Sequence, residues 1–243
     1  MIPNTELLKK IALALVIVFS SSYTHAQELS SLEKGLELYS NARFDEAEQA
    51  FKEYIKSNPE DSKGWYFLGN VQLELFAYSK AIKSYNKAIK IDPEYTDAFF
   101  NRGNVYYEMN KMDKAILDQN EVIRQDSGYT DAYIVRGSAW FNLNDYSKAL
   151  NDFTLAITLD SSIASTYYDR GNTYFRMQKY AEAESDFSRA IQYLNSNPDY
   201  FFNRALTRFI LELNDAACSD LEKAAELGDE DAKAYLEEFC NGL

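Results

Sequence analysis

SKGWYFLGNVQLELFAYSKAIKSYNKAIKIDPEY, residues 62–95, is the 34-residue stretch that decides the fold. Its fixed points, in order, are Trp65, Leu68, Gly69, Ala81, Tyr85, Ala88 and Pro93. The same residue types return when the sequence is stepped by 34 residues in either direction. The eighth position of each unit is small: Gly35, Gly69, Gly103, Gly137, Gly171 and Ala205. A period of this length indicates an array of stacked structural units.

Three further positions support the period. The fourth position is mostly aromatic: Ser31, Trp65, Phe99, Tyr133, Tyr167 and Phe201. The twentieth is always alanine: Ala47, Ala81, Ala115, Ala149, Ala183 and Ala217. The twenty-fourth is mostly large: Phe51, Tyr85, Gln119, Phe153, Phe187 and Leu221. We therefore predict six units without insertions, at residues 28–61, 62–95, 96–129, 130–163, 164–197 and 198–231.

This pattern resembles the tetratricopeptide repeat (TPR) of bacterial exported proteins, although Gln72 stands where the family has Tyr. The resemblance implies an all-α, right-handed superhelical solenoid of antiparallel helix pairs. The small residues then lie where paired helices cross, and large side chains fill the adjoining grooves. The sixth unit lacks the aromatic or Met turn residue of the others, so its turn is the least clear from sequence. The stretch 223–236 also resembles Sel-like repeats, and residues 232–243 are predicted to form a capping helix.

The first 26 residues predict a cleaved secretory signal. Lys9 and Lys10 precede an apolar run of nine residues, 11–19, and a small-residue segment ends at Ala26. Nine residues are too few for a membrane span, which needs about 20. We therefore expect an exported protein, periplasmic or secreted, without stable membrane insertion. The net charge of −13 disfavours a nucleic-acid partner.

The composition gives no support for an enzyme. The only histidine is His25, inside the predicted signal, so the mature chain lacks the imidazole of a catalytic triad or a zinc site. No phosphate-binding loop or metal motif is present, and no cofactor is expected. The two cysteines, Cys218 and Cys240, lie near the C-terminus, and in an oxidising compartment they could form a disulfide that ties the cap to the array. The alternative is two buried thiols.

An Arg and an Asp recur together, 16 residues apart, in the last four units. The pairs are Arg102 with Asp118, Arg136 with Asp152, Arg170 with Asp186, and Arg204 with Asp220. We predict that each pair joins the two helices of its unit as a bidentate, partly buried ion pair. The first two units have neither residue.

The resemblance also places a ligand-binding groove along the first helices. Its predicted lining combines amides with aromatic rings: Tyr66, Asn70, Phe100, Asn101, Asn104, Tyr107, Phe141, Tyr168, Asn172, Phe175 and Asn203. Asn side chains can donate to and accept from a peptide backbone, and aromatic rings add apolar area. The groove of related proteins holds extended peptides. The alternative is that the rings pack on one another and the amides are merely solvated.

The charged residues of the predicted groove favour a neutral or basic ligand. Lys63 and Arg176 stand among six acids: Glu74, Asp97, Glu108, Asp131, Asp169 and Asp199. The sequence therefore predicts a non-enzymatic scaffold for a peptide or protein segment. The alternative function is a carbohydrate- or cell-wall-associated protein that uses the rings as stacking platforms. A monomer is expected, although Leu29, Leu32 and Leu36 at the N-terminal end could pack on a second copy.

Overall fold

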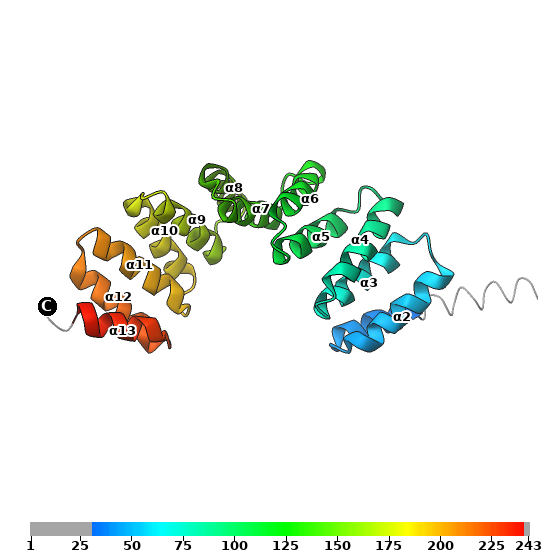
Figure 1. Ribbon diagram of the computed structural model, residues 1–243, viewed down its shortest axis with the longest axis horizontal. Helices are drawn as coiled ribbons and strands as arrows, with labels where there is room; N and C mark the ends of the chain where they lie inside the picture. The colour runs from blue at the N-terminus through cyan, green and yellow to red at the C-terminus, as the bar shows by residue number, and fades with distance from the viewer. Residues whose placement is uncertain (1–30, 241–243) are drawn as a thin grey trace, which may run out of the picture. The chain divides into compact units, whose positions relative to one another are not determined.

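The computed structural model describes residues 31–240, which fold into helices joined by short turns, with no strand in that range (Figure 1). The predicted signal peptide lies outside the described residues. The chain divides into two compact units, the first ending at Val105 and the second beginning at Tyr106. In the first unit residues 31–40 are helical and are followed by α2 (Phe44–Ser57), α3 (Ser62–Glu74) and α4 (Tyr78–Ile91).

The division between the units falls within α5 (Thr96–Glu108). The second unit continues with α6 (Met112–Gln125), α7 (Thr130–Asn142), α8 (Tyr146–Leu159), α9 (Ala164–Arg176), α10 (Tyr180–Tyr193), α11 (Pro198–Ile210), α12 (Asn214–Glu226) and α13 (Glu230–Phe239). Within each unit, consecutive helices pack as antiparallel pairs, as predicted: α3 with α4, α7 with α8, α9 with α10, and α11 with α12.

The small eighth position lets the two helices of a pair approach closely. A Cβ atom added to Gly137 would lie 2.8 Å from the Phe153 ring, and one added to Gly69 would lie 2.6 Å from the Tyr85 ring. These distances are shorter than any ordinary carbon contact. The ring at the twenty-fourth position therefore fills the space that a side chain at the eighth would take. In the sixth repeat the corresponding pair is Ala205 and Leu221, both fully buried.

Each helix pair is joined by a turn of one repeated geometry. The fifteenth position of every repeat has a positive φ, although none of these residues is glycine: Ala42, Phe76, Asn110, Asn144, Gln178 and Glu212. In this conformation the backbone N–H groups that follow the first helix donate to its last carbonyl groups. For example, the Asn144 N–H donates to the Phe141 carbonyl and the Asp145 N–H to the Trp140 carbonyl. The sixth turn, the least clear from sequence, has the same geometry at Glu212, whose φ is 61°.

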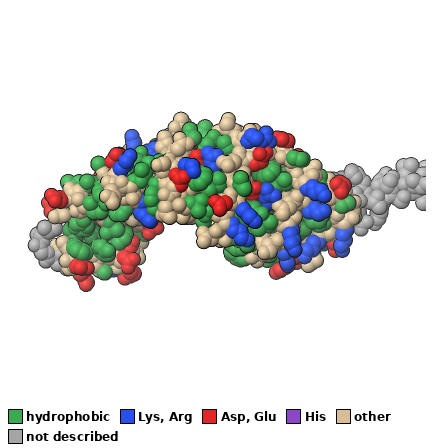
Figure 2. Space-filling model, turned by 45° about the horizontal axis from the view of Figure 1, so that its top comes forward, with side chains coloured by type: hydrophobic (Ala, Val, Ile, Leu, Met, Phe, Trp, Pro, Cys, Tyr) green, Lys and Arg blue, Asp and Glu red, His purple; other side chains and the backbone are tan. Residues whose placement is uncertain are grey.

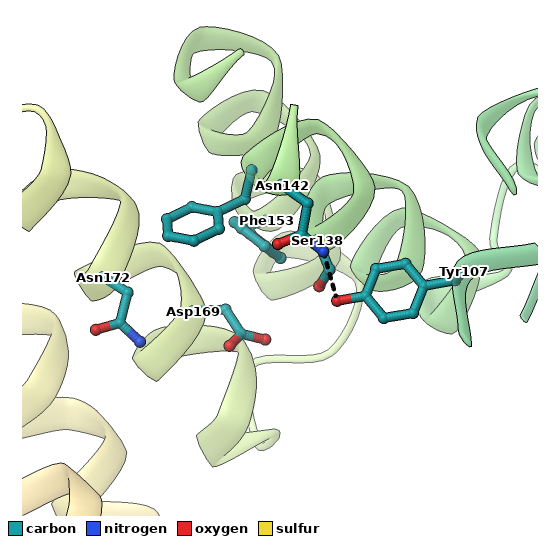
Figure 3. Close-up of a pocket in the computed structure, with 7 residues that line it drawn as sticks. Tyr107, Ser138, Asn142, Phe153, Asp169 and Asn172 are labelled. Atoms are coloured by element: carbon teal, nitrogen blue, oxygen red, sulfur yellow. Dashed lines mark hydrogen bonds between the residues drawn. The ribbon is translucent and has the colours of Figure 1, made fainter. Parts of the chain in front are cut away.

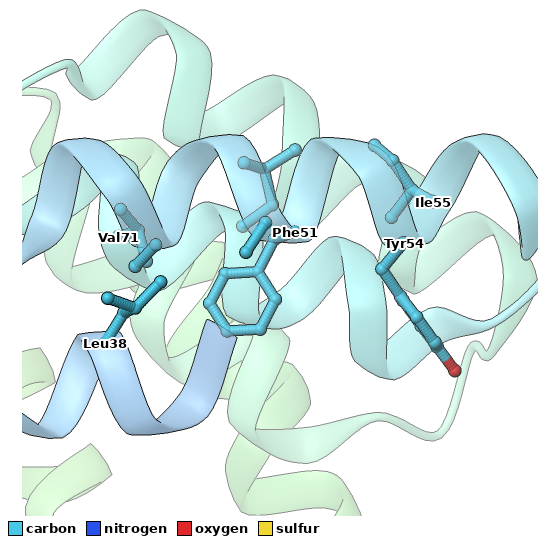
Figure 4. Packing of buried hydrophobic residues seen from close by; sticks show 8 residues of the cluster. Leu38, Phe51, Tyr54, Ile55 and Val71 are labelled. Carbon is cyan, nitrogen blue, oxygen red and sulfur yellow. The ribbon is translucent and has the colours of Figure 1, made fainter. Parts of the chain in front are cut away.

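The core of the first unit is a continuous apolar cluster between the helices (Figure 4). Leu38, Phe51, Tyr54, Ile55 and Val71 are buried in it. Leu38, Phe51, Tyr54 and Ile55 belong to the first repeat and Val71 to the second, so the cluster is completed only when the two repeats pack together. Trp65, the aromatic residue at the fourth position of the second repeat, also holds the connection between α2 and α3. Its indole N–H donates to the Pro59 carbonyl at 2.9 Å.

The C-terminal helix α13 closes the second unit. Ala232 is fully buried in a cluster with residues of α11 and α12. The helix begins at Glu230, with Asp229 as its N-cap, which is two residues before the predicted start. Phe239 occupies the register position where the other repeats have Gly or Ala, and its side chain is 48% exposed.

The charged side chains differ between the two ends of the chain. Four lysines of α4, at positions 80, 83, 87 and 90, are exposed, and their spacing places them on one face of the helix. Figure 2 shows Lys and Arg side chains over the N-terminal helices and hydrophobic side chains gathered at the C-terminal end. The first unit thus presents a basic helix face within an acidic protein.

Candidate ligand-binding face

Three of the four predicted Arg–Asp pairs lie within the second unit as bidentate ion pairs. The Arg136 guanidinium donates to both carboxylate oxygens of Asp152, at 2.8 and 2.7 Å. The other two pairs, Arg170 with Asp186 and Arg204 with Asp220, have the same geometry. All three are largely buried. The fourth pair, Arg102 and Asp118, has its members in different units and stays a prediction.

Each of these arginines also reaches the preceding repeat. The Nη1 atom of Arg136 donates to Asn120 at 2.6 Å, and that of Arg204 donates to Ser188 at 2.9 Å. Arg102 makes the equivalent bond to Asn86 at 2.6 Å within the first unit. One side chain therefore joins two repeats, which the sequence reasoning missed, because the third partner varies between Asn, Thr and Ser.

A second buried polar network also escaped the sequence reasoning. Arg208 donates to Glu184 of the preceding repeat and to Asp220 of its own. The first unit has a network in the same register, with Gln72 in place of the Arg and Ser84 in place of the Asp. Gln72 donates to Glu48 at 3.1 Å and accepts from Ser84 at 2.8 Å. The signal was Gln72 itself, the one departure from the family pattern in residues 62–95. Its side chain links two repeats, because Glu48 belongs to the first repeat and Ser84 to the second.

The two cysteines form a disulfide that joins α12 to the end of α13. Their sequence separation is 22 residues, so the bond closes a loop over the last turn and the capping helix. Cys240 packs on the same apolar cluster as Phe202, Tyr235 and Leu236. The disulfide thus holds α13 against α12.

The eleven predicted groove residues are all half-buried, which leaves part of each side chain open to a ligand. In the first unit three of them form one cluster. The Asn101 amide donates to the Tyr66 hydroxyl at 3.2 Å and to the Asn70 oxygen at 2.9 Å. The Tyr85 hydroxyl also donates to Asn70, at 2.8 Å. The amides therefore bind tyrosine hydroxyls of neighbouring helices and are not merely solvated.

The second unit repeats this bond in the same register. The Asn203 amide donates to the Tyr168 hydroxyl at 2.7 Å, across 35 residues as between Asn101 and Tyr66. Tyr168 also packs on Tyr200, with ring centroids 4.8 Å apart. Burial raises the pKa of both Tyr66 and Tyr168, so each hydroxyl stays protonated at neutral pH. Among residues 31–240, nothing donates to the amide oxygens of Asn101 and Asn203, and these remain as acceptors.

The predicted aromatic row is partly used for packing. Phe141 meets Tyr146 edge to face at 5.5 Å, and Phe175 meets Tyr180 in the same way at 5.4 Å. The Arg176 guanidinium lies 5.8 Å from the centre of the Phe141 ring. These rings are therefore engaged at one edge or face. Phe100, Asn104 and Asn172 are also on first helices, at the register positions predicted for them.

A pocket opens on this face between α7 and α9 in the second unit, and Tyr107 of α5 borders it (Figure 3). It holds about 190 Å³. Its lining is mostly polar: Tyr107, Ser138, Phe141, Asn142, Phe153, Asp169 and Asn172. The Asn142 amide donates to the Tyr107 hydroxyl at 3.1 Å and fixes that wall. Four of the seven lining residues, Tyr107, Phe141, Asp169 and Asn172, were predicted to lie in the groove, but the sequence did not predict that they meet in one pocket.

Asp169 differs from the other acids of the repeat helices. Desolvation by burial raises the pKa of its carboxyl to about 7. Among residues 31–240 the carboxylate has no hydrogen-bond or ion-pair partner, whereas Asp152, Asp186 and Asp220 each hold an arginine. The pocket thus contains a carboxyl group that has no partner among the described residues.

The described part of the chain offers no site for a metal and no membrane span. Within residues 31–240, no three His, Cys, Asp or Glu side chains lie together in a way that could hold a metal ion. In the same range, none of the helices combines the length and the apolar composition that a membrane span needs.

Comparison with known families finds tetratricopeptide repeats between residues 77 and 196. The profile described as "Tetratricopeptide repeat" matches residues 96–129 and 130–163, a second profile of that description matches 164–196, and one described as "TPR repeat" matches 77–110. The chain is therefore a tetratricopeptide repeat protein. Members of this family are generally non-enzymatic protein-interaction scaffolds. No curated protein matches the sequence.

Several solved structures share the fold. The chain is similar to pilF of Pseudomonas aeruginosa, with 17% identity, a TM-score of 0.74 and coverage of 87% of this chain and 97% of that one. It is similar to YrrB, with 22% identity, a TM-score of 0.66 and coverage of 78% and 98%. It is also similar to MamA, with 24% identity, a TM-score of 0.64 and coverage of 68% and 97%. At these identities the likeness shows the fold alone.

Proposed function

We propose that this protein is an exported, non-enzymatic scaffold that holds an extended peptide or protein segment along its first helices. The observation that carries the proposal is the repeated amide–tyrosine bond. It fixes Asn101 and Asn203 by their NH₂ groups and leaves their oxygens to accept from a ligand. A peptide backbone supplies N–H donors at regular intervals whatever its side chains. The solved relative YrrB is described as having a peptide-binding site.

Export has independent support. The N-terminal residues 1–26 have the sequence of a secretory signal, and a disulfide such as Cys218–Cys240 is stable in an oxidising compartment. The periplasm is the compartment that we propose. The test is expression of the full chain in a bacterium, fractionation, and N-terminal sequencing. We expect a periplasmic chain that begins at Gln27, and a cytoplasmic chain that begins at Met1 would contradict export.

The binding test compares two faces of the same molecule. The full mature chain is titrated with a library of fluorescent ten-residue peptides, and binding is followed by polarisation. Replacement of Asn101 and Asn203 together by Ala should abolish capture, since their amide oxygens are the proposed acceptors for the peptide backbone. The matched control is Asn151→Ala, because Asn151 is exposed on the second helix α8 and should be neutral. Equal binding by both variants would contradict the proposed face.

A glycan ligand is less favoured by the packing of the rings. Phe141 and Phe175 each make an edge-to-face contact with a turn aromatic, and the Arg176 guanidinium lies over the Phe141 ring, so both rings are already engaged within the protein. A glycan-binding protein should depend on Tyr107 and Phe175 and should be displaced by soluble sugars. We expect soluble sugars to leave peptide binding unchanged. We also expect a monomer in light scattering, with Leu32 packed on the first core cluster.

A further inference from the structure

We propose that the pocket around Asp169 is a subsite for one cationic side chain, Lys or Arg, of the bound segment. This inference rests on the proposed peptide-binding function and names the chemistry of one position in the ligand. It starts from the register of the array. Asn101 and Asn203 occupy the sixth position of their repeats, and each donates to a tyrosine at the fifth position of the preceding repeat.

Asp169 has no tyrosine at the corresponding position of the preceding repeat. Asp169 is the sixth-position residue of the fifth repeat, and the fifth position of the preceding repeat is Ile134, which has no polar atom in its side chain. A carboxylate cannot donate as an Asn amide does, and Ile134 cannot accept. The interaction that the third and sixth repeats make within the protein is therefore missing at this place. A carboxyl group without a partner among the described residues is left at the pocket.

The geometry of the pocket fits a side chain rather than a whole small molecule. Its volume of about 190 Å³ is below the range of roughly 300–1,000 Å³ that is usual for sites of drug-sized ligands. Figure 3 shows the Asp169 carboxylate pointing from α9 into the space bordered by Ser138 and Tyr107. Lining atoms of Ser138, Asn142 and Asn172 offer further hydrogen bonds to an ammonium or guanidinium group.

The charges around the pocket also favour a cation. Tyr168 and Tyr200 flank Asp169 as neutral phenols, and Asp199 adds a negative charge from α11. The nearby cation, Arg176, lies over the Phe141 and Tyr146 rings. Burial opposes ionisation of Asp169 in the empty pocket, and a bound cation would reverse that effect, because an opposite charge favours the carboxylate. Ligand binding and ionisation of Asp169 are then coupled.

The test uses peptides of one neutral sequence that differ only at the central residue, which is Lys, Arg, norleucine or Glu. The full mature chain should bind the Lys and Arg peptides roughly tenfold or more tightly than the norleucine peptide, as expected for a charge-assisted hydrogen bond. Asp169→Asn should reduce the Lys and Arg affinities to the norleucine level and leave the norleucine affinity unchanged. Asp113→Asn, the same charge change at an exposed site on α6, should have no effect.

A second measurement reports on the carboxyl directly. Carbon-13 NMR should show the pKa of the Asp169 carboxyl fall when the Lys peptide is added, and a structural role would leave it unchanged. Peptides that bind with the same affinity whatever their centre would overturn the subsite and leave the proposed function standing. If no peptide binds, the proposed function fails and the subsite with it.

Discussion

Arg136 donates two hydrogen bonds to Asp152, 16 residues later, and joins the two helices of one repeat. Its remaining nitrogen donates to Asn120 in the repeat before. The same side chain therefore stabilises both the helix pair and its stacking on a neighbour. Its exposure is 17%, and that of Asp152 is 3%, so removal of one member leaves a charge in a largely buried place.

We expect Arg136→Ala to destabilise the protein by about 3–5 kcal/mol, because the Asp152 carboxylate would remain buried without its cation. Arg136→Lys should cost less, since it keeps the charge and loses the bidentate geometry. Thermal unfolding followed by circular dichroism measures both. Arg189→Ala is the control, because Arg189 is exposed on α10. An unchanged melting temperature for Arg136→Ala would show that the pair is not stabilising.

Gly137→Ala should also be destabilising, through a steric contact. The new Cβ would lie 2.8 Å from the Phe153 ring, and the two helices would have to separate. Overpacking of this kind costs about 1–3 kcal/mol. The double variant Gly137→Ala with Phe153→Leu copies the Ala205 and Leu221 pair of the sixth repeat and should recover part of the loss. Chemical denaturation of the two variants side by side tests this, and no recovery would contradict the pairing.

The period of 34 predicted the repeats because packing requires it. The Gly at the eighth position packs against the aromatic ring at the twenty-fourth, so the presence of one predicts the other. The Arg–Asp pairs were predictable for the same reason, since both members recur together. The αL conformation at the fifteenth position was not predictable, because the residue type there differs between repeats and none of these residues is glycine.

The candidate site was less predictable than the fold. Its amides were visible as a row in the sequence, but their bonds to Tyr66 and Tyr168 depend on how two repeats are rotated against each other. Asp169 appeared in the sequence as one acid among several. Only the structure shows that it lies in a pocket without a partner among the described residues. The 34-residue period predicts only what the repeats share. The proposed pocket depends on Asp169, which stands where the third and sixth repeats have Asn101 and Asn203.

Replacement of Thr166 is predicted to stabilise the protein, unlike the substitutions above. Its side chain is fully buried, and its hydroxyl has no hydrogen-bond partner among residues 31–240. An unsatisfied buried polar group costs about 1–3 kcal/mol. Thr166→Val keeps the shape and removes the hydroxyl, so it should raise the melting temperature. Thr166→Ser is the contrast, because it keeps the hydroxyl and loses a methyl group, and it should lower the melting temperature.

The disulfide should stabilise the C-terminal end. We expect Cys218→Ser to reduce the free energy of unfolding by about 2–4 kcal/mol, because the bond closes a loop of 22 residues and restricts the unfolded chain. A reducing agent should have the same effect on the wild type and none on the variant. Hydrogen exchange locates the effect, and we expect faster exchange in α13. Faster exchange confined to the N-terminal unit would contradict this assignment.

Asp169 should make stability fall as the pH rises from about 4 to 7. Its folded-state pKa of about 7 lies above the ordinary value of 3.8, so between these values the folded protein binds a proton that the unfolded chain has released. The folded state is therefore favoured at the lower pH and loses that advantage as the pH rises through 7. At 1.36 kcal/mol for each pH unit, the loss has an upper bound of roughly 4 kcal/mol.

The measurement is urea denaturation of the wild type and of Asp169→Asn at several values between pH 4 and 8. The variant cannot ionise at this position, so the difference between the two stability curves isolates Asp169 from the surrounding Asp199, Tyr168 and Tyr200. We expect the variant to gain stability relative to the wild type as the pH rises and to level off above pH 7. A cationic peptide in the pocket should weaken this trend, because it stabilises the ionised carboxyl in the folded state. Parallel curves for the two proteins would show that Asp169 ionises as an ordinary surface acid, and the pocket would then have no desolvated carboxyl to offer a ligand.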